Sequence, residues 1–176
     1  LRAVVRLWGA LGKRVLLTAP TGRAAKRMSE ATGAPSQTIH RLLEWMPGAA
    51  AFRRNAGNPL DADLIVVDES SMLDVVLAAQ LLDAIPPSTS LLLVGDADQL
   101  PPVGPGSVLA DVIASGAARV VALSEIFRQA SQSGIVQNAH RVNHGEMLLP
   151  TTDPKADFHF VKVDEPPRTV QLVQTL

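Results

Sequence analysis

The chain has 176 residues, of which 47% are hydrophobic and 19% are charged, and its formal net charge is −1. This length and composition suit one compact globular domain with part of a second. The chain has no cysteine, which excludes a disulfide framework and a thiolate metal site and favours the interior of a cell. No apolar run approaches the roughly 20 residues of a membrane span and no signal peptide is visible, so we expect a cytoplasmic protein with no membrane partner.

The small net charge conceals a strong asymmetry along the chain. Residues 1–60 carry ten Lys or Arg and two acids, a net charge of +8, whereas residues 61–125 carry one Arg and ten acids, a net charge of −9. A basic block followed by an acidic block predicts two ligand surfaces, one for a polyanion and one for a metal-bound nucleotide. The alternative, that the two blocks interleave in space, stays open at this point.

Apolar residues at helical spacing alternate with short β-branched runs along the whole chain. This alternation predicts right-handed βαβ units and an α/β fold, with a parallel sheet flanked by helices. The predicted helices cover residues 1–11, 23–31, 38–44, 72–85, 107–114 and about 126–144, with a further helix from Pro166. The predicted strands cover residues 14–18, 64–67, 90–94, 119–123 and 158–163. Residues 46–62 are predicted to form a loop or small hairpin, and residues 150–156 a linker.

The run Leu64–Val67 leads without a break into two adjacent carboxylates, Asp68 and Glu69. Four consecutive apolar residues indicate a strand buried on both faces, and its carboxyl end is where ligands sit in open α/β sheets. Two acids there are costly unless a cation neutralises them. A nucleotide-bound Mg²⁺ would do so and would leave one carboxylate to handle a water molecule. The alternative is an ordinary helix start, where Asp, Glu and Ser are favoured.

A second strand also ends in acids, in the run Asp96-Ala97-Asp98-Gln99, and a rigid Leu-Pro-Pro segment follows it. Because an amide both donates and accepts hydrogen bonds, Gln99 is suited to contact a phosphate oxygen and a water together. Arg128 lies between the predicted strand 119–123 and the helix that follows. A guanidinium there is suited to a γ-phosphate, with a surface salt bridge as the alternative.

Two hydroxyl-bearing turns lie at strand-to-helix junctions in the basic block. Thr21, Gly22 and Arg23 form the first, and Thr38, His40 and Arg41 form the second. Hydroxyls, helix amides and guanidiniums in this arrangement favour a nucleic-acid backbone track. Trp45 and Phe52 flank the 46–62 segment, where they would either stack on bases or pack under the loop, and both readings stay open.

Taken in order, these stretches resemble the motifs of the RecD/TraA-like branch of superfamily 1 DNA helicases, the 5′→3′ branch that includes the exodeoxyribonuclease V alpha subunit. Residues 19–25 resemble motif Ia and residues 38–43 the next DNA-contacting segment. Residues 66–72 resemble motif II, the Walker B element, residues 95–103 motif III and residues 127–129 motif IV. The likeness covers about residues 1–150 closely.

The resemblance implies a RecA-like P-loop NTPase fold that lacks its first strand and its Walker A loop. Residues 9–14 are the nearest match to a phosphate loop, but they have the pattern of a helix end. We therefore expect residues 1–149 to be an incomplete first RecA-like motor domain, with a small insertion at 46–62. Residues 150–176 would be a linker and the truncated start of a second RecA-like domain.

The resemblance also implies a role for each matching residue. Asp68 would hold Mg²⁺ through water, Glu69 would activate the attacking water, and Gln99 and Arg128 would contact the γ-phosphate of ATP. The residues expected along DNA are Thr21, Gly22, Arg23, Thr38, His40, Arg41, Pro101 and Pro102.

The implied activity is ATP-dependent translocation on single-stranded DNA and unwinding of duplex DNA. Its implied partners are single-stranded DNA, single-strand to double-strand junctions and other subunits of a recombination or repair complex. We expect the full-length parent to be an ATP hydrolase, and the fragment alone to be inactive. The alternatives are a catalytically silent DNA-binding or scaffold module with the same fold, and a different P-loop ATPase motor.

Overall fold

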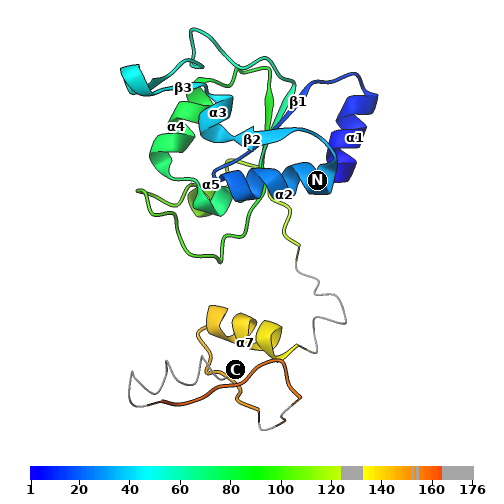
Figure 1. Cartoon of the computed structure of the whole chain (residues 1–176), viewed down its shortest axis with the longest axis vertical. Coiled ribbons are helices and arrows are strands. Elements are labelled where there is room, and N and C mark those ends of the chain that lie inside the picture. Colours follow the sequence, from blue (N-terminus) through cyan, green and yellow to red (C-terminus); the bar gives the residue numbers. More distant parts are fainter. Residues whose placement is uncertain (124–132, 152, 154, 164–176) are drawn as a thin grey trace. The chain divides into compact units, whose positions relative to one another are not determined.

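The computed structural model describes residues 1–123, 133–151, 153 and 155–163 (Figure 1). The chain divides into two compact units, Leu1–Val120 and Val121–Leu176, and each is described by itself. The division expected at residues 149 and 150 stays a prediction. Among the described residues, no helix has both the length and the apolar character that a membrane crossing requires.

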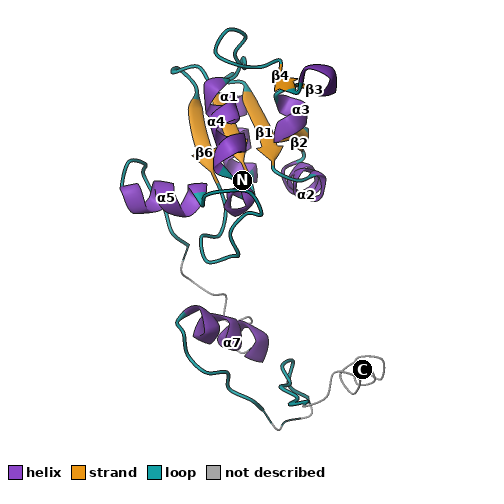
Figure 2. Cartoon of the chain, turned by 90° about the vertical axis from the view of Figure 1, so that its left-hand side faces the viewer, coloured by secondary structure: helices purple, strands orange, loops and turns teal. Residues whose placement is uncertain are grey.

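Four parallel strands form the sheet of the first unit, in the order β2-β1-β5-β6 (Figure 1). The strands are β1 (Val15–Ala19), β2 (Ser36–Thr38), β5 (Leu64–Val67) and β6 (Ser90–Leu93). The helices around it are α1 (Arg2–Ala10), α2 (Gly22–Thr32), α3 (Ile39–Leu42), α4 (Val75–Asp83) and α5 (Val108–Ser115) (Figure 2). The predicted α/β fold, a parallel sheet with flanking helices, is confirmed.

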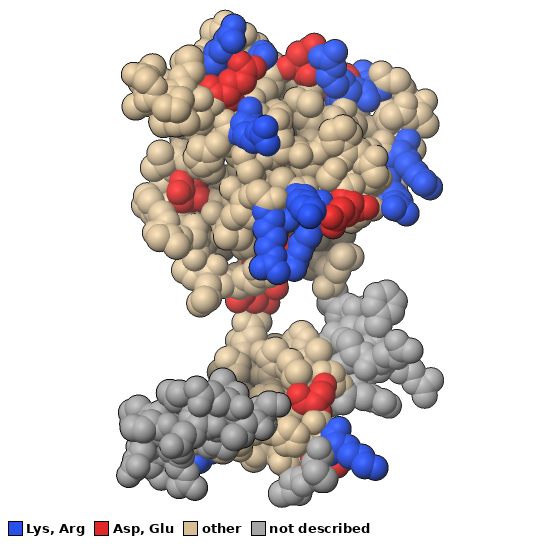
Figure 3. Space-filling model, viewed as in Figure 1, with Lys and Arg blue, Asp and Glu red and all other residues tan. Residues whose placement is uncertain are grey.

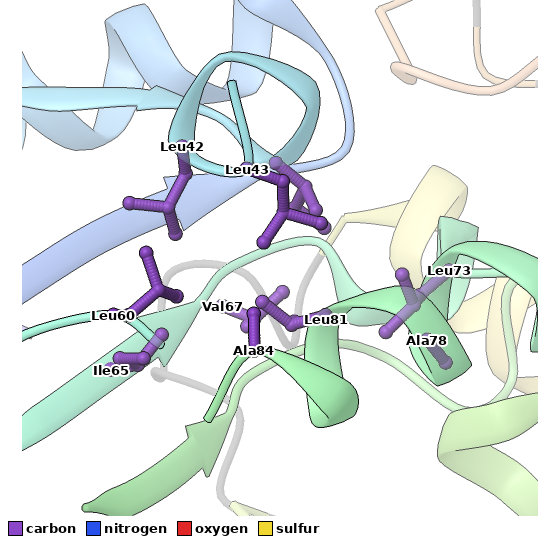
Figure 4. Close-up of a cluster of buried hydrophobic side chains, with 10 residues drawn as sticks. Leu42, Leu43, Leu60, Ile65, Val67, Leu73, Ala78, Leu81 and Ala84 are labelled. Atoms are coloured by element: carbon purple, nitrogen blue, oxygen red, sulfur yellow. The ribbon is translucent and has the colours of Figure 1, made fainter. Parts of the chain in front are cut away.

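Strand β5 supplies both hydrophobic cores of this unit, because successive side chains of a strand point to opposite faces. All four of its residues are buried. Leu64 and Val66 pack with α1 and α2 on one face. Ile65 and Val67 pack with α3 and α4 on the other, where they meet Leu81 (Figure 4). A strand with no polar face is the physical basis of the predicted two-sided burial.

Side-chain caps decide where helices α2 and α4 begin. Thr21 Oγ1 and Asp74 Oδ1 each accept a hydrogen bond from the backbone N–H three residues further on, at 3.2 and 2.7 Å. Helix α4 therefore begins at Val75 and not at residue 72 as predicted, because Ser70–Met72 forms the separate 3₁₀ turn η2.

The ends of the first two helices are glycines, as the sequence predicts. Gly12 follows α1 with φ of 68°, and Gly33 follows α2 with φ of 75°. Only glycine adopts this left-handed conformation without strain. The stretch Gly9–Arg14 is therefore a helix end that leads into β1, as predicted.

The 46–62 segment contains a small hairpin, as predicted. Its strands β3 (Trp45–Met46) and β4 (Ala51–Phe52) pair antiparallel across the 3₁₀ turn η1 (Pro47–Ala49). The segment then returns to the sheet through Leu60, which is 4% exposed and packs in the same core cluster as Ile65 (Figure 4).

Three strand predictions differ from the structure. Ser36–Thr38 forms the edge strand β2, although its polar sequence predicts only a helix start. The strands predicted over 119–123 and 158–163 are wrong, since no strand among the described residues pairs with either run. Val121 and Leu123 are 78% and 97% exposed. A β-branched run becomes a strand only where a neighbouring backbone takes up its hydrogen bonds.

In the second unit, α7 (Gly134–Asn143) is the described part of the helix predicted over 126–144. Residues 126–132 and the helix predicted from Pro166 lie outside the described residues. Asp157 Oδ1 accepts a hydrogen bond from the Gly134 N–H at 2.8 Å. The Ser133 hydroxyl and this backbone donor together hold the pKa of Asp157 below its ordinary value.

The Asp63 carboxylate ties the start of β1 to the start of β5. It accepts hydrogen bonds from Lys13 Nζ at 2.9 Å and from the Arg14 N–H at 2.8 Å. These bonds, that of Lys13 first, hold the pKa of Asp63 below its ordinary value. A carboxyl whose pKa is lower in the folded state stabilises the fold above its unfolded pKa, about 4, and this contribution is lost as the pH falls through the folded value.

We predict that Asp63→Asn lowers the Tm of the chain at pH 7, and that its difference from wild type shrinks as the pH falls below about 4. Thermal unfolding followed by circular dichroism between pH 7 and pH 3 measures both effects. Asp98 is an exposed acid that forms no ion pair among the described residues. Asp98→Asn is therefore the control and should leave Tm nearly unchanged. A pH-independent effect of Asp63→Asn would contradict the assignment.

Candidate functional site

The carboxyl ends of β1, β5 and β6 meet at one edge of the sheet. Val67 pairs with Thr18 of β1 and with Leu93 of β6, so the chain leaves these strands at the same level. This edge is the ligand-binding edge of open α/β sheets. Both acid-ended runs that the sequence singles out therefore lie side by side there.

Asp68 and Glu69 follow β5 directly, and both are half-buried. The Asp68 N–H donates to the Thr18 carbonyl at 3.0 Å, and Asp68 Oδ1 accepts a hydrogen bond from the Glu69 N–H at 3.1 Å. Neither carboxylate forms an ion pair within the described part of the chain. Half-buried carboxylates without a protein cation beside them fit a hydrated Mg²⁺ carried by a nucleotide.

Glu69 adopts a left-handed backbone conformation, with φ of 53° and ψ of 39°. For a residue other than glycine this conformation costs about 1 kcal/mol. Backbone strain of this kind clusters at functional sites and persists only where the surrounding structure holds it. The direction of the Glu69 side chain is therefore set by a strained turn between β5 and η2.

Ser70 holds this turn against the neighbouring strand. Its backbone N–H and its Oγ–H both donate to the Val94 carbonyl, at 2.9 and 2.6 Å. Ser70 is fully buried, at 0% exposure. A Cβ added to Gly95 would lie 3.1 Å from Ser70 N and 2.9 Å from Leu109 Cδ2, so this close approach favours glycine. The residues after β5 and after β6 are thus fixed to each other.

The run Asp96–Gln99 forms an exposed turn with few internal hydrogen bonds. Asp96 Oδ1 accepts from the Asp98 N–H at 3.0 Å, and Gln99 Nε2 reaches Asp96 Oδ2 only at 3.5 Å. Gln99 and Pro101 are exposed, and Pro102 is half-buried. The Gln99 amide is therefore accessible to a ligand at the edge that also carries Asp68.

The far end of this loop is anchored to the start of α4. The Val75 N–H donates to the Pro105 carbonyl at 2.9 Å. A Cβ added to Gly104 would lie 2.7 Å from the Cβ and Cγ atoms of Asp74, the residue that caps α4. Residues 95–106 therefore form a loop whose two ends are both fixed to the segment 70–75.

A shallow groove of about 320 Å³ lies beside the β1 and β2 ends of the sheet. Strand pairing sets Ala19 beside Thr38, which brings the two predicted hydroxyl-bearing turns together. Thr38 Oγ1 accepts a hydrogen bond from the Arg41 N–H at 3.3 Å and caps α3. The groove is lined by Gly22, Ala25, Lys26, Ser29, Ser36, Gln37, Thr38 and Arg41.

Some cations of the basic block are neutralised within the fold, and others are not. Two ion pairs join the basic block to the acidic block, Lys13–Asp63 and Arg14–Asp61. In the described structure Arg23, Arg27 and Arg41 form no ion pair. Lys and Arg side chains gather over α2 (Figure 3). The two charge blocks thus interleave in part, and a basic surface remains around α2 and the groove.

His40, Trp45 and Phe52 form one ring cluster at the base of the hairpin. The Trp45 and Phe52 ring centres are 4.8 Å apart, and His40 lies 5.7 Å from Phe52 and 6.5 Å from Trp45. Trp45 therefore packs on its cross-strand neighbour, yet it remains 43% exposed. The predicted packing of Trp45 under the loop is therefore observed, against Phe52 and His40. Base stacking by the exposed part of Trp45 stays a prediction.

The structure places most of the predicted site residues in two groups, with Pro101 and Pro102 on the loop after β6 and with Arg23 and His40 outside the groove. Asp68, Glu69 and Gln99 share the β5–β6 edge, while Gly22, Thr38 and Arg41 line the groove with Thr21 at its helix start. Arg23 and His40 do not line the groove, because Arg23 lies on another side of α2 and His40 packs in the ring cluster. Arg128 lies outside the described residues.

The groove is also lined by residues outside the list of predicted DNA contacts. Lys26 and Ser29 lie one and two helical turns after Gly22 on the same face of α2, a spacing visible in the sequence. Ser36 and Gln37 belong to β2, and only strand pairing reveals their position.

Residues 1–105 match a family model described as an AAA domain. The chain is 46% identical over 145 residues to the ATP-dependent RecD2 DNA helicase of Deinococcus radiodurans, an alignment that covers 82% of the chain and 20% of that protein. It is 38% identical over 161 residues to RecBCD enzyme subunit RecD of Mycolicibacterium smegmatis, covering 81% of the chain and 29% of that protein. It is also 29% identical over 175 residues to mouse DNA helicase B, covering 86% of the chain and 16% of that protein.

We predict that Gly104→Ala lowers the free energy of unfolding by about 1–3 kcal/mol, because the new Cβ would overlap the Asp74 side chain. Gly48→Ala is the matched control, since a Cβ there meets nothing within 4 Å. Urea unfolding of both variants measures the difference. Equal effects of the two substitutions would show that the loop is not held at Asp74.

Proposed function

The chain belongs to the AAA domain family and is RecD-like, and on this premise we propose that it forms part of an ATP-dependent DNA helicase motor. The motor would couple ATP hydrolysis to translocation on single-stranded DNA and to unwinding of the duplex. One observation carries the proposal: the carboxylate pair and Gln99 share a sheet edge at β5 and β6, and the basic groove lies at β1 and β2 of the same sheet.

The β5–β6 edge is the proposed site of hydrolysis. Bound Mg²⁺–ATP would supply the electrophilic γ-phosphorus and neutralise the developing charge. Asp68 would hold the Mg²⁺ through water, and Glu69 would accept the proton of the attacking water at its carboxylate. Gln99 would orient that water and contact the γ-phosphate. We propose that Arg128 also contacts the γ-phosphate. The accessible Gln99 amide and the two carboxylates, which form no ion pair among the described residues, support these roles.

The groove is the proposed site of the DNA backbone. Its hydroxyls and amides suit neutral hydrogen bonds to phosphate oxygens, and Lys26 and Arg41 supply positive charge. Arg23 and Thr21 extend the track along the start of α2, and His40 continues it toward the ring cluster. Pro101 and Pro102 would meet the DNA strand from the loop that follows β6, which would give the loop that carries Gln99 a contact with each ligand.

The two half-buried carboxylates Asp68 and Glu69, which form no ion pair within the described part of the chain, favour a hydrolytic site over a catalytically silent DNA-binding module. The groove beside the carboxylate edge favours a nucleic-acid motor over another kind of P-loop ATPase motor.

The chain spans between about a fifth and three tenths of the length of the RecD-type relatives named above, 20% and 29%. For the full-length protein we propose movement along DNA in the 5′→3′ direction, a role in recombination or repair, and action in the cytoplasm. The Mycolicibacterium smegmatis relative is named as a subunit of the RecBCD enzyme, which supports other protein subunits as partners. We propose residues 1–149 as its first motor domain and residues 150–176 as the linker and start of a second.

We predict that Glu69→Gln in the full-length protein lowers DNA-stimulated ATP hydrolysis at least about 100-fold, because the amide cannot accept the proton of water. Nucleotide affinity, measured with a fluorescent ATP analogue, should change less than twofold. Asp111→Asn, an exposed acid on α5, is the control and should keep wild-type turnover. Near-normal turnover by Glu69→Gln would rule out the proposed base.

We predict that Arg41→Ala weakens binding of a single-stranded oligonucleotide severalfold. The association constant should also fall less steeply with salt, with the slope of its logarithm against the logarithm of the salt concentration reduced in magnitude by about 0.7, which corresponds to the loss of one phosphate contact. Fluorescence anisotropy at several salt concentrations measures both quantities. Arg6→Ala removes an exposed guanidinium from α1, away from the groove, and is the matched control. An unchanged slope for Arg41→Ala would exclude the groove as the backbone track.

A further inference from the structure

Ser71 is the residue whose chemistry the fold leaves unexplained. The residue is 8% exposed, and its Oγ makes no hydrogen bond. Within the described part of the chain it is the one buried side-chain polar atom of which this is true. A buried hydroxyl carries one donor and two acceptor positions, and an unmet group of this kind destabilises the fold that contains it.

The neighbouring serine shows that this part of the fold does satisfy hydroxyls where they serve packing. Ser70 Oγ donates to the Val94 carbonyl at 2.6 Å, in addition to the bond made by its own N–H. The two serines lie in the same 3₁₀ turn and are both buried, but only Ser70 is bonded. The pair therefore separates a structural hydroxyl from an unused one.

The segment that carries Gln99 begins directly against Ser71. A Cβ added to Gly95 would lie 3.0 Å from Ser71 N, so the backbone of the two segments is in contact there. Between its anchors at Val94 and Pro105 the loop is loosely held, with Leu100 and Val103 88% and 110% exposed. A rearrangement of residues 96–99 when Gln99 meets its ligand would bring amide groups of this segment past the Ser71 hydroxyl.

We infer that Ser71 is a positioning residue for ATP hydrolysis, and that its hydroxyl takes an amide of the segment Gly95–Gln99 as its hydrogen-bond partner in the nucleotide-bound state. Glu69 lies two residues before Ser71 in the chain. The bond would therefore fix Gln99 beside the water that Glu69 activates. The inference rests on the proposed function, which it deepens. It also explains why an unsatisfied hydroxyl is retained in the fold, since local costs of this kind are typical of functional sites.

The test compares Ser71→Ala with Ser70→Ala in the full-length protein. Ser71→Ala should leave Tm equal to wild type or raise it, because it removes an unpaired buried hydroxyl, whereas Ser70→Ala should lower Tm. Ser71→Ala should also lower the DNA-stimulated kcat about tenfold or more, with KM for ATP changed less than twofold. An unchanged or raised Tm together with a lowered kcat is the signature that a purely structural serine would not produce.

Three results would overturn the inference: wild-type kcat in Ser71→Ala, a loss of Tm as large as that of Ser70→Ala, or failure of Ser71→Ala to fold. Wild-type hydrolysis and its loss in Glu69→Gln, measured alongside, test the proposed function separately. If both hold while Ser71→Ala is normal, the site is a hydrolytic one and only the role of Ser71 is wrong. If the wild type does not hydrolyse ATP, the proposed function and this inference fall together.

Discussion

The two-sided burial of strand β5 is the constraint on which the rest of the first unit depends. Each fully buried aliphatic side chain contributes about 1.5–3 kcal/mol relative to an exposed one, and β5 divides four of them between two cores. Both helix layers therefore pack on the same short strand. Because β5 pairs with β1 and β6 in one register, its burial also determines which residues reach the carboxyl edge together.

Several local departures from good packing lie in the segment that follows β5. Glu69 has a left-handed backbone, Ser71 Oγ is unbonded, and Gly95 lies close to the backbone of this segment. Left-handed backbone at residues other than glycine also occurs at Glu44, directly before β3, and at Ala50 in the hairpin. The departures after β5 coincide with the carboxyl edge of the sheet, where a fold must hold reactive groups in place.

The charged residues form ion pairs within the fold at one end of the sheet and a basic surface at the groove. The pairs Lys13–Asp63 and Arg14–Asp61 tie the starts of β1 and β5 together, at the end of the sheet opposite the carboxyl edge. Exposed pairs of this kind stabilise weakly, so their value lies more in the register of the strands than in energy. Three cations that form no ion pair among the described residues, Arg23, Arg27 and Arg41, lie instead around α2 and the groove, where a polyanion would meet them.

The sequence by itself determined the elements whose signal is local: strand β5 from its apolar run, the starts of α2 and α3 from Thr21 and Thr38, and the acids that follow two strands. Only the tertiary structure decided what depends on distant partners. The polar run 36–38 became strand β2 because β1 offered its edge, while the apolar run 119–123 found no partner among the described residues. The unbonded hydroxyl of Ser71 and the contribution of β2 to the groove arise from segments that are remote in sequence, and backbone pairing and burial are long-range properties that no local pattern contains.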